Sequence, residues 1–450
     1  MCSVPISQTV RRACLLALCF GMAGVAPVRA ADEQFESWTA KGQSTYIWQQ
    51  KPGFGAAYSG QNSLSTAREK SYTFTATGYF GVRPWSGGEV YFNPEVTQGS
   101  AFSNLSGLAG FTNGELTKVS GTNPTVYRQR LFLRQTFNLG GGREQIESDL
   151  NQMAGMVDKN RFVLTVGNFS VLDVFDDNAY AKDPRTQFMN WDNWSYAAFD
   201  YAADSRGYGW GLAAEWYKDD WVVRFGRMTG PRQPNGLPLD YQIGRHYGDQ
   251  LEVERGYSIG ELPGKVRVLA WRNRAILANY NDALTYGLTN PGDPDHQWIT
   301  KVRTGEKIKY GFGVNVEQAV AKYAGVFLRA MKADGRSETY AFTEADASLS
   351  AGLSLDGGAW GRGKDTAGIA LARNMLSPDR RNYLAAGGIS FFIGDGALNY
   401  RGENLFEIYY NLNIWKKVGL SLDYQHVQNP AYNADRGPVN FFAARVHAEF

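Results

Sequence analysis

Few residue patterns in this chain could support catalysis. Its 450 residues include four histidines, and no G-x-S-x-G, H-E-x-x-H or phosphate-binding-loop pattern occurs. Asp173, Asp176 and Asp177 lie close together as calcium ligands would, but their spacing misses the EF-hand pattern. Structural or pore-lining acids are the simpler interpretation. We therefore expect no enzyme activity, no cofactor and no bound metal.

Three arginines in one alternating segment point to a different kind of site. Arg128, Arg130 and Arg134 are separated by two and four residues, and Leu131 and Leu133 lie between the last two arginines. Side chains two apart share a face of a strand, so the pattern predicts a basic face and an apolar face. An arginine facing lipid costs about 2–4 kcal/mol near the bilayer midplane, and an unpaired one is also unfavourable in a dry core. A water-filled lumen would accommodate all three, and a solvated sheet face paired with acids is the alternative.

Acids that could oppose these arginines occur in a preceding strand and in a long interruption of the pattern. Residues 168–206 break the alternation with aspartates and many aromatics, so this segment is expected to fold against something, most naturally into a lumen. Arginines facing acids across a narrow pore would suit sugars, whose hydroxyls pair with charged groups. The candidate constriction residues are Arg128, Arg130, Arg134, Glu89, Glu95, Asp173, Asp176, Asp177, Arg185 and Trp191.

Alternating strands are the elements that must position these side chains. Residues 72–82 alternate apolar residues with threonines, and the same period returns in later segments. The last ten residues are the clearest case, because they alternate an apolar set, which would face lipid, with a polar set, which would face a lumen. The apolar set is Phe442, Ala444, Val446, Ala448 and Phe450, and the polar set is Arg445, His447 and Glu449.

The spacing of the strands predicts a closed transmembrane barrel. Short turns such as 84–88 and 415–417 alternate with long loops such as 275–307 and 428–438, as in outer-membrane barrels with short periplasmic turns. The tally of strands is about seventeen, and bacterial barrels usually have an even number. We therefore predict an all-β, antiparallel barrel of sixteen strands with a long inward-folded loop, and eighteen strands as the alternative.

The first thirty residues have the pattern of a secretory signal peptide. Arg11 and Arg12 precede an apolar run, and 28–30 offers a small-x-small cleavage site. All three cysteines lie within this segment, so the mature chain 31–450 is expected to have neither disulfides nor cysteine-bound metals. Without the three arginines of the segment, 43 basic residues remain against 44 acidic ones, which excludes a nucleic-acid footprint.

Several multi-residue stretches resemble the OprB-type carbohydrate-selective porins of Gram-negative outer membranes. The resemblance covers nearly the whole mature chain and is carried by residues 50–54, 58–64, 89–95, 166–170, 173–176, 183–191 and 429–438. It implies a sixteen-stranded barrel in the outer membrane, passive diffusion of sugars and a constriction narrowed by an inward-folded loop. It also implies that the terminal Phe450 is an assembly signal for the barrel-assembly machinery.

Other classes of protein remain open at this point. A polysaccharide-export barrel would have eighteen strands and a strongly basic lumen, and a general porin would lack preference among solutes of one size. A soluble periplasmic β-protein is the remaining alternative. The expected partners of the preferred interpretation are sugars as transported solutes and outer-membrane lipid.

Overall fold

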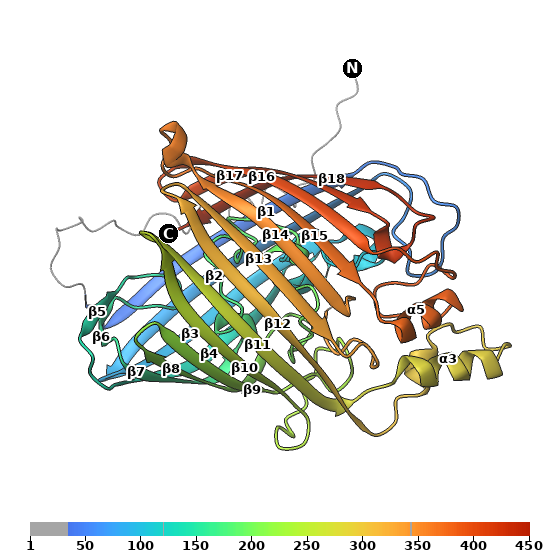
Figure 1. The fold of residues 1–450 in the computed structure, drawn as a ribbon, viewed down its shortest axis with the longest axis horizontal. Coiled ribbons are helices and arrows are strands. Elements are labelled where there is room, and N and C mark those ends of the chain that lie inside the picture. The colour runs from blue at the N-terminus through green and yellow to red at the C-terminus, as the bar shows by residue number, and fades with distance from the viewer. Residues whose placement is uncertain (1–34, 120, 343) are drawn as a thin grey trace.

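The computed structural model describes residues 35–119, 121–342 and 344–450, and the predicted signal peptide lies outside these residues. Within them, sixteen strands form one closed antiparallel barrel in which neighbours in sequence are neighbours in space (Figure 1). The prediction of sixteen strands is confirmed, and the alternative of eighteen is wrong. The barrel strands are β1 (Trp38–Lys51), β2 (Glu69–Trp85), β3 (Gly88–Ser100), β4 (Thr125–Asn138), β7 (Arg161–Phe169), β8 (Gly209–Lys218), β9 (Trp221–Met228), β10 (Tyr247–Ile259), β11 (Leu262–Ile276), β12 (Glu306–Ala321), β13 (Ala324–Ala333), β14 (Ala347–Asp356), β15 (Thr366–Met375), β16 (Glu403–Trp415), β17 (Val418–Gln428) and β18 (Val439–Glu449).

The last strand closes the barrel against the first. β18 pairs with β1 in antiparallel register from Gln43↔Glu449 to Gln50↔Phe442. Phe450 extends the seam, because its backbone exchanges hydrogen bonds of 2.8 and 2.9 Å with Gly42. A Cβ atom on Gly42 would lie 2.2 Å from the Phe450 ring, so only glycine fits opposite the terminal aromatic residue.

The two faces of the wall follow the alternation in the sequence. Phe442 and Val446 are exposed on the outside, where a membrane barrel meets lipid, while Arg445 and His447 are buried inside. The same division separates the threonines of β2, which are buried, from its outward aromatic residues. The predicted lipid and lumen faces of these strands are therefore confirmed.

The two ends of the barrel differ as predicted. At one end the strands are joined by turns as short as 86–87, 219–220 and 416–417, and at the other by long connections that carry helices at the right of Figure 1. Within the described ranges, no helix is long and apolar enough to cross a membrane. The helices are η1 (Phe102–Leu105), η2 (Leu116–Lys118), η3 (Val171–Asp173), α2 (Trp191–Trp194), α3 (Tyr280–Thr289), α4 (Trp298–Lys301), η4 (Gly357–Trp360), α5 (Pro378–Ala385) and η5 (Pro430–Tyr432).

Two of the long connections fold into the barrel instead of away from it. The predicted inward loop is the β7–β8 connection, 170–208. A second, which the sequence did not place inside the barrel, is the β3–β4 connection, 101–124. The two contact each other: Gly114 N donates to Met189 O, and Trp191 N donates to Phe111 O, both at 3.0 Å. Their apolar residues form the main interior cluster, so the middle of the barrel is a packed core.

One connection at the short-turn end also departs from a simple turn. Residues 139–160, between β4 and β7, form a separate two-stranded sheet from β5 (Arg143–Ile146) and β6 (Gly155–Asp158). This β5–β6 hairpin lies at the left edge of Figure 1, at the end of the barrel opposite to α3 and α5.

Candidate functional site

A bulge in β4 decides which of the predicted arginines face the lumen. The register between β3 and β4 shifts so that Asn93 pairs with Arg130 and Pro94 pairs with Arg128. Asn93 is buried on the inner face and Pro94 lies on the outer face, and paired residues share a face. Arg130 and Arg134 therefore point inward. The prediction for Arg128 is wrong, because its exposed side chain lies on the outer wall against Trp210.

Arg130 forms a two-point ion pair with the inward loop. Its Nε and Nη2 donate to the two carboxylate oxygens of Asp173 at 2.7 and 2.6 Å. This planar, bidentate arrangement is the strongest kind of guanidinium–carboxylate contact. The side chains of Arg130 and Asp173 remain 13 % and 28 % exposed, so a solute in the lumen could reach them.

Arg185 brings together acids from a strand and from the second inward connection. Its Nη2 lies 3.1 Å from Glu115 Oε2 and 3.7 Å from Glu95 Oε2. Glu95 also accepts hydrogen bonds from Thr77, Tyr127 and Gln129, which hold its carboxylate in place. Arg185 and Glu95 were predicted from the sequence, and Glu115 was not, because the segment around it has no strand pattern.

Nearby basic groups lower the pKa values of the two loop acids in these pairs. Burial acts to raise the pKa of Glu115, but the nearby Arg185 and Lys118 outweigh it and lower that pKa to about 2. Burial opposes ionisation of Asp173 too, and the Arg130 guanidinium holds its pKa below the usual value. Each arginine therefore lies beside a carboxylate that stays ionised at neutral pH.

Arg134 and Glu89 form a third charged group nearer the short-turn end. They are directly paired residues of β4 and β3, and Arg134 Nη1 lies 3.6 Å from Glu89 Oε2. Arg83 donates to the other oxygen of Glu89 at 2.5 Å. The guanidinium of Arg134 also lies over the Tyr91 and Phe132 rings, 5.4 Å from each centroid, as in a cation–π contact.

The three arginines and Asp173 line a cavity inside the barrel, which we call the constriction cavity. Its volume is about 300 Å³, and its wall joins strands β1, β2, β4 and β7 to the inward loop at Asp173, Asp183 and Arg185. Aromatic rings of Tyr79 and Phe132 line it together with Arg130. A larger cavity of about 870 Å³ lies toward the short-turn end and shares Arg134, Asp173 and Val174 with it.

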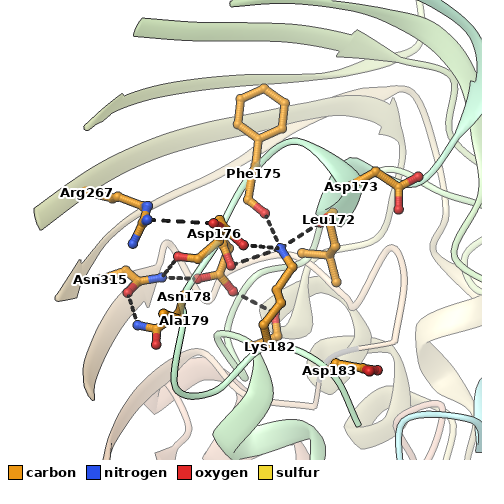
Figure 2. Close-up of polar contacts among 12 residues, drawn as sticks. Leu172, Asp173, Phe175, Asp176, Asn178, Ala179, Lys182, Asp183, Arg267 and Asn315 are labelled. Atoms are coloured by element: carbon orange, nitrogen blue, oxygen red, sulfur yellow. Dashed lines mark hydrogen bonds and ion pairs between the residues drawn. The ribbon is translucent and has the colours of Figure 1, made fainter. Parts of the chain in front are cut away.

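Asp176 and Asp177 join the inward loop to the opposite wall (Figure 2), and Asp177 also borders the larger cavity. Asp176 is 1 % exposed and accepts from Arg329 Nε at 2.8 Å and from Asn315 Nδ2 at 2.6 Å. Asp177 is the exposed neighbour and lies 3.8 Å from Arg267. The two aspartates therefore join the loop to β11, β12 and β13.

The ammonium group of Lys182 lies among backbone carbonyl oxygens of the inward loop, beside Asp177. Its Nζ donates to the carbonyl oxygens of Leu172, Phe175 and Asp176 at 2.7, 3.2 and 3.2 Å, as Figure 2 shows. Asp177 Oδ1 lies 3.8 Å from the same ammonium group. The loop thus satisfies its carbonyl oxygens with a tethered ammonium group.

Trp191 lies in the packed interior instead of on the cavity wall. Its side chain is 4 % exposed and contacts the rings of Phe111, Trp194 and Phe342. Its position differs from the predicted pore-lining one because the 101–124 connection, which the sequence did not place inside, covers it.

The comparisons with known proteins agree with this architecture. The family model described as "Carbohydrate-selective porin, OprB family" matches residues 61–450. The high-pH structure of Pseudomonas putida OprB superposes with a TM-score of 0.68 at 14 % identity, covering 92 % of this chain and 94 % of that one. The outer-membrane channel DcaP of Acinetobacter baumannii gives 0.51 at 10 % identity, with 92 % and 97 % covered. No curated protein matches the chain in sequence.

Proposed function

Because the chain belongs to the carbohydrate-selective porin family OprB, we propose that sugars cross its barrel through the constriction cavity, along the wall of β1, β2, β4 and β7. The protein is an outer-membrane channel through which carbohydrates diffuse passively into the periplasm. The short-turn end of the barrel is the periplasmic end. The cavity at Arg130 and Arg185 is the observation that supports this route.

The chemistry of the constriction cavity suits a polyol. A sugar hydroxyl can accept a hydrogen bond from a guanidinium and donate one to a carboxylate, and the cavity presents both groups side by side at Arg130–Asp173. The rings of Tyr79 and Phe132 add apolar surface to the cavity wall. Each arginine is already paired, so the cavity combines strong local dipoles with little net charge to repel or trap an ion.

A polysaccharide-export barrel fits these features less well. That alternative called for eighteen strands and a strongly basic lumen. The described barrel has sixteen strands, and Arg130, Arg134 and Arg185 each lie within 4 Å of a carboxylate. A general porin would have the same barrel, so an experiment must distinguish that function from the proposed one.

The experiment is liposome swelling with neutral sugars, sugar acids and non-sugar solutes matched in size. We expect sugars to enter faster than size-matched solutes, and the double variant Arg130→Gln/Arg185→Gln to lose this preference. Loss of one hydrogen bond to a charged group, worth about 1.5–3 kcal/mol, weakens the affinity for the sugar more than ten-fold. Arg227→Gln, which changes an outward-facing arginine, is the control. Equal rates for all solutes of one size in the wild-type protein would reduce the function to that of a general porin.

The terminal residue supports a proposal about assembly. Phe450 is 62 % exposed and sits at the seam where β18 closes on β1. An exposed aromatic carboxy-terminus at the periplasmic end is available to the barrel-assembly machinery before the seam closes. We therefore keep Phe450 as the proposed assembly signal.

A further inference from the structure

The β5–β6 hairpin reaches from the periplasmic rim far into the lumen. Asn93, the sixth residue of β3, donates through Nδ2 to Asn151 Oδ1 at 2.9 Å. At about 3.3 Å per residue, this contact lies roughly 16 Å of strand away from the periplasmic start of β3. The tip of the hairpin, residues 149–152, therefore lies directly beneath the constriction.

Basic side chains of the barrel wall hold this tip by its backbone. Arg134 Nη1 donates to Asn151 O at 3.0 Å, and Lys41 Nζ donates to Asp149 O at 2.6 Å and to Gln152 O at 3.5 Å. Arg83 donates to Ala154 O at 3.2 Å and Met153 O at 3.4 Å. Three strands thus fix the tip through its carbonyl oxygens.

Apart from the contact of Asn151 Oδ1 with Asn93, these anchoring contacts use the backbone, so the side chains of the tip are placed to line the lumen. Leu150, Asn151 and Gln152 all border the constriction cavity on its periplasmic side. Arg130 and Arg185 line the same cavity. A volume of about 300 Å³ lies at the lower end of the range for small-molecule sites.

We propose that the hairpin tip forms an exit-side subsite that binds one monosaccharide-sized polyol between the constriction arginines and the amides of Asn151 and Gln152. Asn151 Oδ1 already accepts from Asn93, and Gln152 Nε2 donates to Glu147 O at 2.8 Å. Asn151 Nδ2 as a donor and Gln152 Oε1 as an acceptor are the amide atoms that match the hydroxyls of a sugar. The subsite rests on the proposed function, because it lies where the constriction cavity adjoins the larger cavity, and Leu150 and Gln152 line both. It makes the channel discriminate on the periplasmic side as well as at the arginines.

The test is the double variant Asn151→Gly/Gln152→Ala in planar bilayers, with glucose as the probe and current block as the readout. Asn151 has a φ of +52°, which glycine adopts freely, so the backbone anchors stay in place. We expect the apparent affinity for glucose to fall about five-fold for each hydrogen bond lost, most clearly when glucose is added from the periplasmic side. The matched control is Asp219→Gly, which has a φ of +53° in an exposed turn at the same end.

Two further measurements keep the outcomes distinct. Heat-modifiable migration shows that the barrel is assembled, and Gln152→Ala alone is expected to give an intermediate affinity. If glucose blocks the current through Asn151→Gly/Gln152→Ala as strongly as it blocks Asp219→Gly, the proposed subsite is wrong. If Arg130→Gln/Arg185→Gln still abolishes sugar preference in that case, the constriction stands and only the subsite fails. If neither variant alters sugar passage, the proposed route fails as well.

Discussion

The inward loop lies between two walls of the barrel, and arginine–aspartate ion pairs have different roles on the two walls. On the wall from β10 to β18, the Asp176–Arg329 pair is 1 % exposed on each side. On the wall of β1–β4 and β7, the Arg130–Asp173 pair is 13 % and 28 % exposed and borders the constriction cavity. The chemistry is the same and the burial differs. Buried pairs fix the position of the loop, and half-buried pairs remain available to a solute.

Backbone contacts confirm the anchoring role of the first wall. Glu407 accepts from the backbone amides of Met189 and Asn190 at 2.6 and 3.0 Å. Arg445, fully buried in β18, donates to the carbonyl oxygens of Pro184 and Gln187 at 2.7 and 2.9 Å. These side chains satisfy loop groups that would otherwise be buried without partners. The loop is thereby held across the barrel, and the open space remains on the other side.

Breaking the buried pair should give the largest effect. Asp176→Ala leaves the Arg329 guanidinium buried without its carboxylate, which costs about 3–5 kcal/mol. We expect a lower temperature of heat-modifiable unfolding, a larger conductance and weaker sugar preference, because the loop is released. Asp176→Ala/Arg329→Met is the matched control, since replacing both partners with apolar groups is often neutral. A single variant that behaves like the wild-type protein would show that the pair does not anchor the loop.

A buried carboxyl on the anchoring side should give a smaller, pH-dependent effect. Asp192 in α2 is 2 % exposed and accepts from Asn374 Nδ2 at 2.7 Å, and burial raises its pKa to about 7. Because the folded pKa lies above the unfolded one, the ionised form opposes folding. The stability that protonated Asp192 contributes is therefore fully present below about pH 4 and is lost as the pH rises through 7.

The variant Asp192→Asn removes this titration and keeps an oxygen for Asn374. We expect it to raise the melting temperature at pH 8 and to change little at pH 4, which thermal melts at the two pH values would measure. An equal shift at both pH values would mean that Asp192 does not titrate between them.

The sequence predicted the strands of this barrel well, because apolar and polar residues alternate along a strand whose two faces meet lipid and the lumen. It placed Arg130 and Arg134 in the lumen but misplaced Arg128, since a one-residue bulge shifts the phase of β4 and leaves no signal in the alternation. The inward fold of 170–208 followed from its aromatic residues.

The inward fold of 101–124 was missed because its glycines, serines and asparagines are also typical of exposed loops. Its apolar residues Phe102, Leu108 and Phe111, all buried, were the available signal. The pairing of Glu115 with Arg185 could not be predicted, because it depends on how two loops pack inside the closed barrel.

Single cysteines can test directly which side of the inward loop solutes pass, because residues 31–450 contain no cysteine. Val174 lies between the two cavities on the β1–β4 side, and Ser354 lies on the inner face of β14; both are half-buried. The measurement is sugar flux after a bulky thiol reagent has modified Val174→Cys or Ser354→Cys. We predict that the adduct at position 174 reduces flux strongly, that sugar slows its formation, and that the adduct at position 354 leaves flux unchanged. Block at position 354 with free passage at 174 would contradict the proposed route.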